Sequence, residues 1–171
     1  MPSEVVPKII LSDCRGFSLV ELMVALSIVG VMAAVGVPQL GTIRDSFDRN
    51  SARRQITFDI GRAKAEAAAS GARGVMKITP DLKAYAFGVD TLPYNDPVDF
   101  DRAIFTASLP GDVRFFSQSN PFVFSPRGYM VDKEDNLTQE VFSLSQRGKT
   151  FCDGTVFPVG TVAYDCNKGG Y

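Results

Sequence analysis

The sequence predicts an α+β fold in which one long N-terminal α-helix, with a transmembrane first half, packs on an antiparallel β-sheet domain. Two observations lead to this fold class. An apolar run passes into an alanine-rich run of good helix formers, and Gly71 and Gly74 then favour a stop. After Gly74 the pattern changes to short runs rich in β-branched and aromatic residues, separated by Pro, Gly, Asn and Asp.

The composition is that of an ordinary folded domain. The chain has 171 residues, of which 45% are hydrophobic and 22% charged, which is enough for one domain with a real core. Its 18 basic and 19 acidic side chains give a net charge of −1, so it lacks a global basic field for nucleic acid or anionic lipid. It has no histidine, which excludes the commonest general base, the usual hydrolase triad and most catalytic metal sites.

Residues 17–41 are predicted to form the transmembrane segment of the helix. No other charge occurs between Glu21 and Arg44, and about 20 apolar residues span a bilayer core. A cleaved secretory signal would have a shorter apolar region followed by a small-residue cleavage site, which is not found here. A charge near the bilayer centre costs about 2.5–3.5 kcal/mol, so we expect the Glu21 carboxylate to have a function.

Residues 42–74 are predicted to continue the helix as an amphipathic segment. Pro38 removes one backbone hydrogen bond and is expected to kink or loosen the helix without ending it. Steps of 100° per residue separate two apolar faces. One face comprises Ile43, Phe47, Phe58, Ala65 and Ala69, and the nearly opposite face comprises Ala52, Ile56, Ile60, Ala63 and Ala67. We expect one face to pack on the chain's own domain and the other on neighbouring subunits; the alternative is burial of both within the monomer.

Residues 75–171 are predicted to form the β-rich globular domain. The expected strand regions are VMKIT, KAYAFGV, RAIFTA, DVRFF, FVFS, VFSLS and GTVFPVGTVAY. Most of the 13 phenylalanines lie in this region, and we expect them to fill the interface between helix and sheet.

Cys152 and Cys166 are predicted to form a disulfide, provided that the domain faces an oxidising compartment. Cys14 precedes the apolar segment and would lie on the opposite side of the membrane. The bridge would close a loop of about 15 residues, worth roughly 3 kcal/mol in the chain-entropy model. The alternative is two free or buried thiols.

The junction RGFSLVELMVALSIVGVMAAVGVP, residues 15–38, resembles the N-terminal signature of type IV pilins and type II secretion pseudopilins. The resemblance implies that residues 1–16 are a leader, removed by a prepilin peptidase after Gly16, and that the amine of Phe17 is then methylated. It implies that Glu21 pairs with the N-terminal amine of a neighbouring subunit, and it assigns Pro38, where the apolar run ends, to assembly as well. The alternative for Glu21 is a side chain that reaches the lipid headgroups.

The same resemblance decides the expected orientation. Basic residues are more frequent just after the apolar run than before it, and this count alone would place the large domain in the cytoplasm. The resemblance implies the reverse: a single-pass protein of the bacterial inner membrane, with its globular domain in the periplasm and later part of a filament.

Two further stretches resemble the GspH/FimT-type minor pilins and minor pseudopilins. They are DIGRAKAEAAASGARGVMKI, where a helix leads straight into a strand, and FVFSPRGYM, with its F-x-P-x-G turn. The resemblance implies a non-enzymatic, cofactor-free structural subunit of a type II secretion pseudopilus or a type IV pilus. Its expected partners are other pilin subunits, the prepilin peptidase and the inner-membrane assembly platform. The alternatives are a DNA-receptor minor pilin and a membrane-anchored sensor or enzyme of unknown chemistry.

Other candidate sites carry less weight. The acidic stretches 94–101 and 132–136 contain calcium-type ligands, but they lack EF-hand spacing, and acidic turns are more often simply solvated. The basic stretches 53–55 and 146–149 are short and are not interleaved with aromatic residues, so nucleic-acid binding is not expected. No nucleophile–base pair or phosphate-binding loop is visible in the sequence, so no enzymatic activity is expected.

Overall fold

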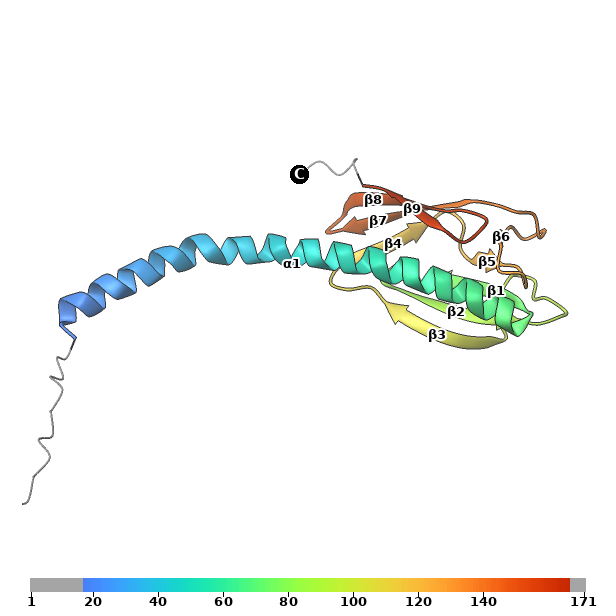
Figure 1. Cartoon of the computed structure of the whole chain (residues 1–171), viewed down its shortest axis with the longest axis horizontal. Coiled ribbons are helices and arrows are strands. Elements are labelled where there is room, and N and C mark those ends of the chain that lie inside the picture. The colour runs from blue at the N-terminus through green and yellow to red at the C-terminus, as the bar shows by residue number, and fades with distance from the viewer. Residues whose placement is uncertain (1–16, 167–171) are drawn as a thin grey trace, which may run out of the picture. The chain divides into compact units, whose positions relative to one another are not determined.

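The computed structural model describes residues 17–166, apart from the side chains of Val35, Pro38 and Gln39 (Figure 1). The predicted leader, the cleavage position Gly16 and the side chain of Pro38 therefore lie outside the described residues. The chain divides into two compact units, Met1–Thr42 and Ile43–Tyr171.

Helix α1 runs from Leu19 to Ser70, a length of 52 residues, and continues past position 38. It ends immediately before Gly71, whose φ of 62° lies in the left-handed region that glycine adopts without steric cost. The predicted stop at Gly71 is confirmed. Only one further residue separates this glycine from the first strand.

Nine strands follow, and every pairing between them is antiparallel. One sheet has the order β3-β2-β1-β5-β6 and the other has the order β4-β7-β8-β9. The first sheet comprises β1 (Arg73–Ile78), β2 (Ala84–Asp90), β3 (Arg102–Ser108), β5 (Phe122–Phe124) and β6 (Met130–Val131). The second comprises β4 (Val113–Ser117), β7 (Glu140–Gln146), β8 (Lys149–Val156) and β9 (Val162–Asp165).

The predicted α+β class is thus confirmed, but the strands form two sheets where one was expected. The division arises because β4 pairs with β7 whereas β5, the next strand in the chain, returns to pair with β1. A backbone bond from the Phe115 N–H to the Leu82 carbonyl, 2.8 Å long, connects β4 to the β1–β2 turn. Strand order of this kind depends on partners far apart in the sequence, and strand propensity does not encode it.

Two differences from the expected strands have local causes. The run GTVFPVGTVAY is not one strand: β8 ends at Val156, and a turn closed by a 2.8 Å bond from the Gly160 N–H to the Phe157 carbonyl leads into β9. Pro158 within this turn has no N–H for a sheet ladder. The two-residue strand β6 was not predicted, because it is too short to show alternation.

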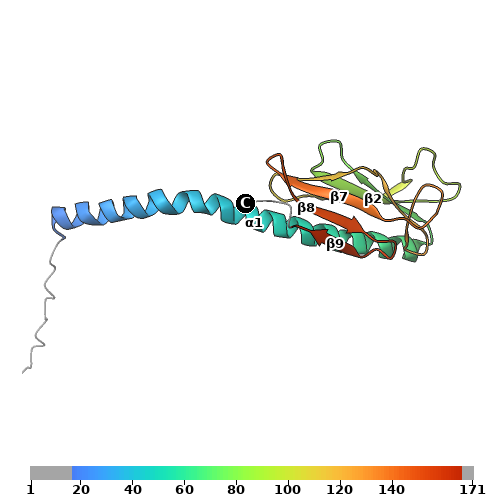
Figure 2. The same cartoon turned by 90° about the horizontal axis from the view of Figure 1, so that it is seen from above.

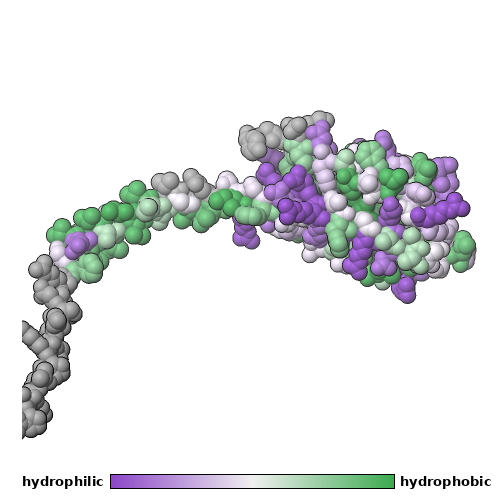
Figure 3. Space-filling model, viewed as in Figure 1, coloured by the Kyte–Doolittle hydropathy of each residue, from purple (hydrophilic) through white to green (hydrophobic). Residues whose placement is uncertain are grey.

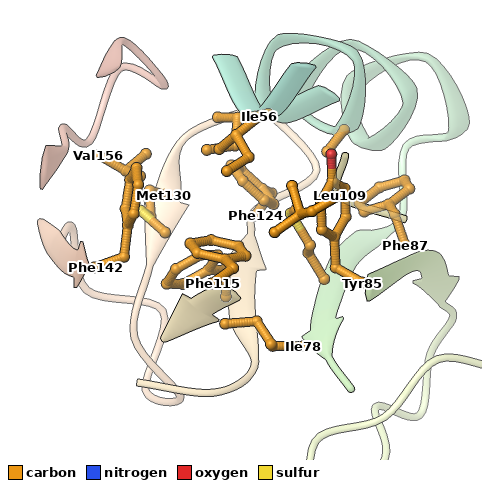
Figure 4. Packing of buried hydrophobic residues seen from close by; sticks show 14 of the residues in the cluster. Ile56, Ile78, Tyr85, Phe87, Leu109, Phe115, Phe124, Met130, Phe142 and Val156 are labelled. Carbon is orange, nitrogen blue, oxygen red and sulfur yellow. The ribbon is translucent and has the colours of Figure 1, made fainter. Parts of the chain in front are cut away.

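One face of the second half of α1 packs on the strands. The side chains of Ala52, Ile56, Ile60, Ala63 and Ala67 are fully buried, so this is the apolar helix face that the domain covers. Figure 4 shows Ile56 pointing from the helix toward the aromatic side chains beneath it. Alanine at three of the five positions lets the helix backbone approach the sheets closely.

The core beneath the helix is aromatic and includes residues of both sheets (Figure 4). The Phe115 ring contacts Phe142 edge-on at 4.9 Å between ring centroids, and it lies 5.8 Å from Phe122 and 5.9 Å from Tyr85. Phe115 and Phe142 belong to the second sheet, and Tyr85 and Phe122 to the first. Phe87, Phe115, Phe122, Phe124 and Phe142 are buried, as expected, whereas Phe116 is 51% exposed and Phe157 37%.

A buried polar contact also joins the helix to the first sheet. The Tyr85 hydroxyl donates a hydrogen bond of 2.6 Å to the Asp59 carboxylate, which is 7% exposed. Burial, together with the neighbouring carboxylate, raises the pKa of Tyr85 far above its ordinary value, so the hydroxyl stays protonated and continues to donate. This bond satisfies a carboxylate that would otherwise be buried at a cost.

Candidate assembly site

Ser18 caps the start of α1. Its hydroxyl accepts a 3.2 Å hydrogen bond from the Val20 N–H, and its carbonyl accepts the first helical bond, 3.1 Å long, from Leu22. Glu21 follows in the first turn, where the positive end of the helix dipole favours a carboxylate. Ser18 and Glu21 have the S-x-x-E spacing of a capping box, a signal for the helix start that our sequence interpretation did not use.

The Glu21 side chain and the first described residue are open to partners. Glu21 is exposed, and within residues 17–166 its carboxylate has no hydrogen-bond or ion-pair partner. Phe17 is 80% exposed. Glu21 is thus the only charged residue in the described part of this unit, and its carboxylate is unpaired near the capped start of an apolar helix.

Apart from Glu21 and Ser27, no described side chain of residues 19–40 is polar, and all of these side chains are exposed. The face of this segment that Figure 3 shows is mostly green. Large hydrophobic residues more than half exposed include Leu19, Leu22, Met23, Leu26, Val29, Met32 and Leu40. No helix within the described residues meets the length and mean hydropathy that a membrane span requires.

The second apolar face of α1 remains uncovered by the chain's own domain. Ile43 is 50% exposed, Phe47 67% and Phe58 70%. Ala65 and Ala69 on the same face are also exposed. Burial of both faces within the monomer is therefore excluded, and the assignment of this face to neighbouring subunits stays a prediction.

In each acidic stretch one carboxylate is held by hydrogen bonds within the protein. Asp101 accepts 2.8 Å hydrogen bonds from the N–H and hydroxyl of Thr91 and one of 2.9 Å from the Asn95 amide, which together hold its pKa below the ordinary value. Asp132 accepts bonds from the backbone N–H groups of Asn136 and Glu134, and its pKa is likewise lowered. Among the described residues no group of three or more His, Cys, Asp or Glu side chains could hold a metal ion.

The turn after β5 shows why the F-x-P-x-G pattern needs its glycine. Gly128 has a φ of 76°, and its N–H closes the turn on the Ser125 carbonyl at 2.8 Å. A Cβ added there would lie 3.0 Å from Lys64 Cγ on α1. Lys64 also donates a hydrogen bond to the Val159 carbonyl in the β8–β9 turn. The signature glycine thus lets one lysine of the helix contact two turns.

The structure contains the disulfide between Cys152 and Cys166, with 4.1 Å between their Cα atoms. Asp153 of β8 pairs with Asp165 of β9, so the two cysteines stand directly opposite each other at the end of this ladder. Cys152 is 2% exposed and belongs to the core. The bridge therefore ties the edge strand β9 to the buried strand β8. Cys14 lies outside the described residues.

Replacing both Cys152 and Cys166 by Ser is expected to destabilise the domain by about 3 kcal/mol, because the unfolded chain regains the entropy of a loop of about 15 residues. Thermal unfolding of the full chain should show a melting temperature lower by several degrees. Cys14→Ser is the matched control and should leave it unchanged. Alkylation of both thiols in native protein without reductant would contradict the bridge.

The fold described above is pilin-like. One long capped helix has a lone carboxylate in its first turn, and a domain of antiparallel strands packs on its second half. Residues 11–37 match the prokaryotic N-terminal methylation motif. The chain thus carries a prepilin-type N-terminal motif on a pilin-like fold.

Solved structures with this fold include the type IV minor pilin FimU of Pseudomonas aeruginosa in two crystal forms. One gives a TM-score of 0.57 at 14% identity, covering 72% of this chain and 92% of FimU, and the other gives 0.53 at 15%, covering 68% and 91%. The minor pseudopilin EpsH from the type 2 secretion system of Vibrio cholerae gives 0.47 at 14%, covering 69% and 98%. Comparison with curated protein sequences gives no significant match.

Proposed function

We propose that this chain is a minor structural subunit of a type IV pilus or a type II secretion pseudopilus. A prepilin peptidase removes residues 1–16 after Gly16, and the new amine on Phe17 is methylated. Residues 17–41 hold the subunit in the inner membrane, residues 42–74 continue the helix, and residues 75–171 form the periplasmic domain. The observation that carries this proposal is an apolar helix start, with one unpaired carboxylate, on a pilin-like fold.

The exposed apolar surface supports an assembly role. A helix that is apolar on all sides is stable only where lipid or other protein surrounds it. The domain covers one face of α1 from Ala52 onward, and the first half of the helix keeps its large side chains exposed. Lipid covers these side chains while the subunit waits in the membrane, and helices of neighbouring subunits replace the lipid in the filament. The assembly platform of the inner membrane drives this transfer.

The unpaired carboxylate supports the same role. In a filament core a charge without a partner is costly, and an ammonium group within hydrogen-bond distance offsets part of that cost. Glu21 has the required position, four residues after Phe17 and exposed in the first helical turn. We assign it to the N-terminal amine of the adjacent subunit, and Pro38 to the bend or local loosening that filament packing requires.

Processing provides the experimental test. A peptidase site that accepts only a minimal side chain at Gly16 should reject Gly16→Val, so the precursor should remain uncut in the membrane. Intact-mass measurement of membrane-extracted protein distinguishes the precursor from a product that begins at Phe17.

Gly30→Val is the matched control, since a Cβ at Gly30 would meet nothing within 4 Å. This variant should be processed normally. A mature species beginning at Phe17 from the Gly16→Val variant would overturn the proposal.

A further inference from the structure

A groove lies between α1 and Tyr164 of β9, inside the unit that begins at Ile43. Its volume is about 510 Å³, and its lining residues are Asn50, Arg53, Arg54, Thr57, Phe58 and Tyr164. Figure 2 shows β9 beside the second half of the helix. The Tyr164 hydroxyl lies 3.0 Å from both the Thr57 hydroxyl and the Arg53 carbonyl, so the floor of the groove is held in place.

Strand β9 leaves one row of backbone groups unpaired beside this groove. It is the last strand of its sheet and pairs only with β8. The Phe157 N–H bonds the Thr161 carbonyl at 2.9 Å, and hydrogen-bonded pairs alternate along an antiparallel ladder. Counting from that pair, the N–H and C=O groups of Val162 and Tyr164 point away from β8. The edge therefore presents two N–H donors and two C=O acceptors. They are spaced two residues apart, as pairing with another strand requires.

The groove is positively charged. Arg53 donates hydrogen bonds to the Asn50 side chain and to Cys166 Sγ. Arg54 is exposed, and within the described residues its guanidinium has no hydrogen-bond or ion-pair partner. Burial raises the pKa of Tyr164, so its ring remains neutral. None of the described residues that line the groove is acidic.

We propose that this groove binds an extended acidic segment of a partner protein, which adds to β9 as a further strand. The free edge supplies the backbone hydrogen bonds, Arg54 binds a carboxylate of the segment, and the exposed ring of Phe58 covers an apolar side chain next to it. A peptide backbone matches alternating donors and acceptors, whereas a nucleic-acid backbone offers acceptors only. This function goes beyond assembly through the helix and does not depend on it.

The experiment uses the full chain in detergent micelles and a fluorescein-labelled, end-capped peptide of four Val-Glu repeats. Fluorescence polarisation should show saturable binding that weakens with added salt. The same peptide with Gln for Glu should bind less tightly by about tenfold, as expected for losing a charge-assisted hydrogen bond. A version with N-methyl groups on alternate amides cannot pair with the edge and should not bind. Equal binding of this version would overturn strand addition.

Two variants locate the site. Arg54→Gln should weaken binding by about tenfold, whereas Arg114→Gln should not, because Arg114 is exposed on β4 at the opposite edge of the same sheet. Val162→Pro removes an outward N–H without removing a bond to β8, and should abolish binding while an unchanged melting temperature shows that the domain is folded. Unchanged binding by Arg54→Gln, or no binding to the wild-type chain, would overturn the proposal. Binding of a single-stranded oligonucleotide that Val162→Pro leaves intact would replace it with a nucleic-acid site.

Discussion

Glu21→Ala is expected to abolish incorporation of this subunit into its filament, while membrane insertion, cleavage after Gly16 and folding of the outer domain stay intact. Removing the carboxylate makes the anchor more apolar by at most about 2.5–3.5 kcal/mol, so insertion does not suffer. The described part of the chain offers Glu21 no partner, so its loss breaks no contact within the subunit. The cost arises only beside a neighbour, whose amine then lacks its counter-charge in an apolar surrounding.

Co-purification of the full-length variant with its pilin partners measures this effect, and protease accessibility of the outer domain shows that the domain has been delivered and folded. Glu66→Ala is the matched control, since it removes an acidic residue from the same helix within the other compact unit. Glu21→Gln should fail like Glu21→Ala, because an uncharged amide does not neutralise an ammonium group. Normal incorporation of both Glu21 variants would remove the pairing role and leave the fold assignment standing.

Asp90→Ala is expected to destabilise the domain by about 3–5 kcal/mol, because it leaves a buried arginine without its counter-charge. The Arg73 Nε donates to the Asp90 carboxylate at 3.0 Å, and the two residues are 4% and 0% exposed. Arg73 also stacks on the Tyr94 ring at 4.1 Å and donates to the Asn95 carbonyl, while the Asn95 N–H returns to Asp90. Loss of one carboxylate therefore loosens both the β1–β2 pairing and the loop after β2.

A loss of this size is a large share of the 5–15 kcal/mol by which domains are usually stable. Thermal unfolding of the full chain should show a melting temperature lower by roughly 10 °C or more. Asp96→Ala, in the exposed part of the same loop, is the matched control and should change little. The double variant Arg73→Met/Asp90→Leu should recover much of the loss, since it removes both charges from the interior. A double variant less stable than Asp90→Ala would contradict this account.

The buried Arg73–Asp90 pair is one feature of the fold that the sequence did not predict. Arg73 begins β1, Asp90 ends β2, and they are register partners, so the pair fixes a register that a one-residue slip would destroy. In the sequence the two residues are an ordinary arginine and an ordinary aspartate, 17 positions apart. The two residues are buried because the loop that contains Tyr94 packs over them. No local sequence pattern predicts this burial.

The sequence by itself determined the features that depend on near neighbours. The helix and its stop at Gly71 follow from a run of good helix formers and one left-handed glycine. Most strands follow from β-rich runs between turn residues, and the disulfide follows from two late cysteines. The capping pattern at Ser18 was equally visible, although our interpretation did not use it.

Tertiary structure alone decided how those elements combine. Two apolar helix faces were visible in the sequence, but only packing showed that Ala52, Ile56 and their neighbours are covered while Phe47 and Phe58 remain exposed. The split into two sheets arises because β5 pairs with β1 across the intervening strands. Arg53, which lines the charged groove, donates a hydrogen bond to Cys166, 113 positions later in the chain. Helix and turn preferences act over a few residues, whereas sheet order, face selection and grooves depend on contacts between distant segments, which form only when the whole domain packs.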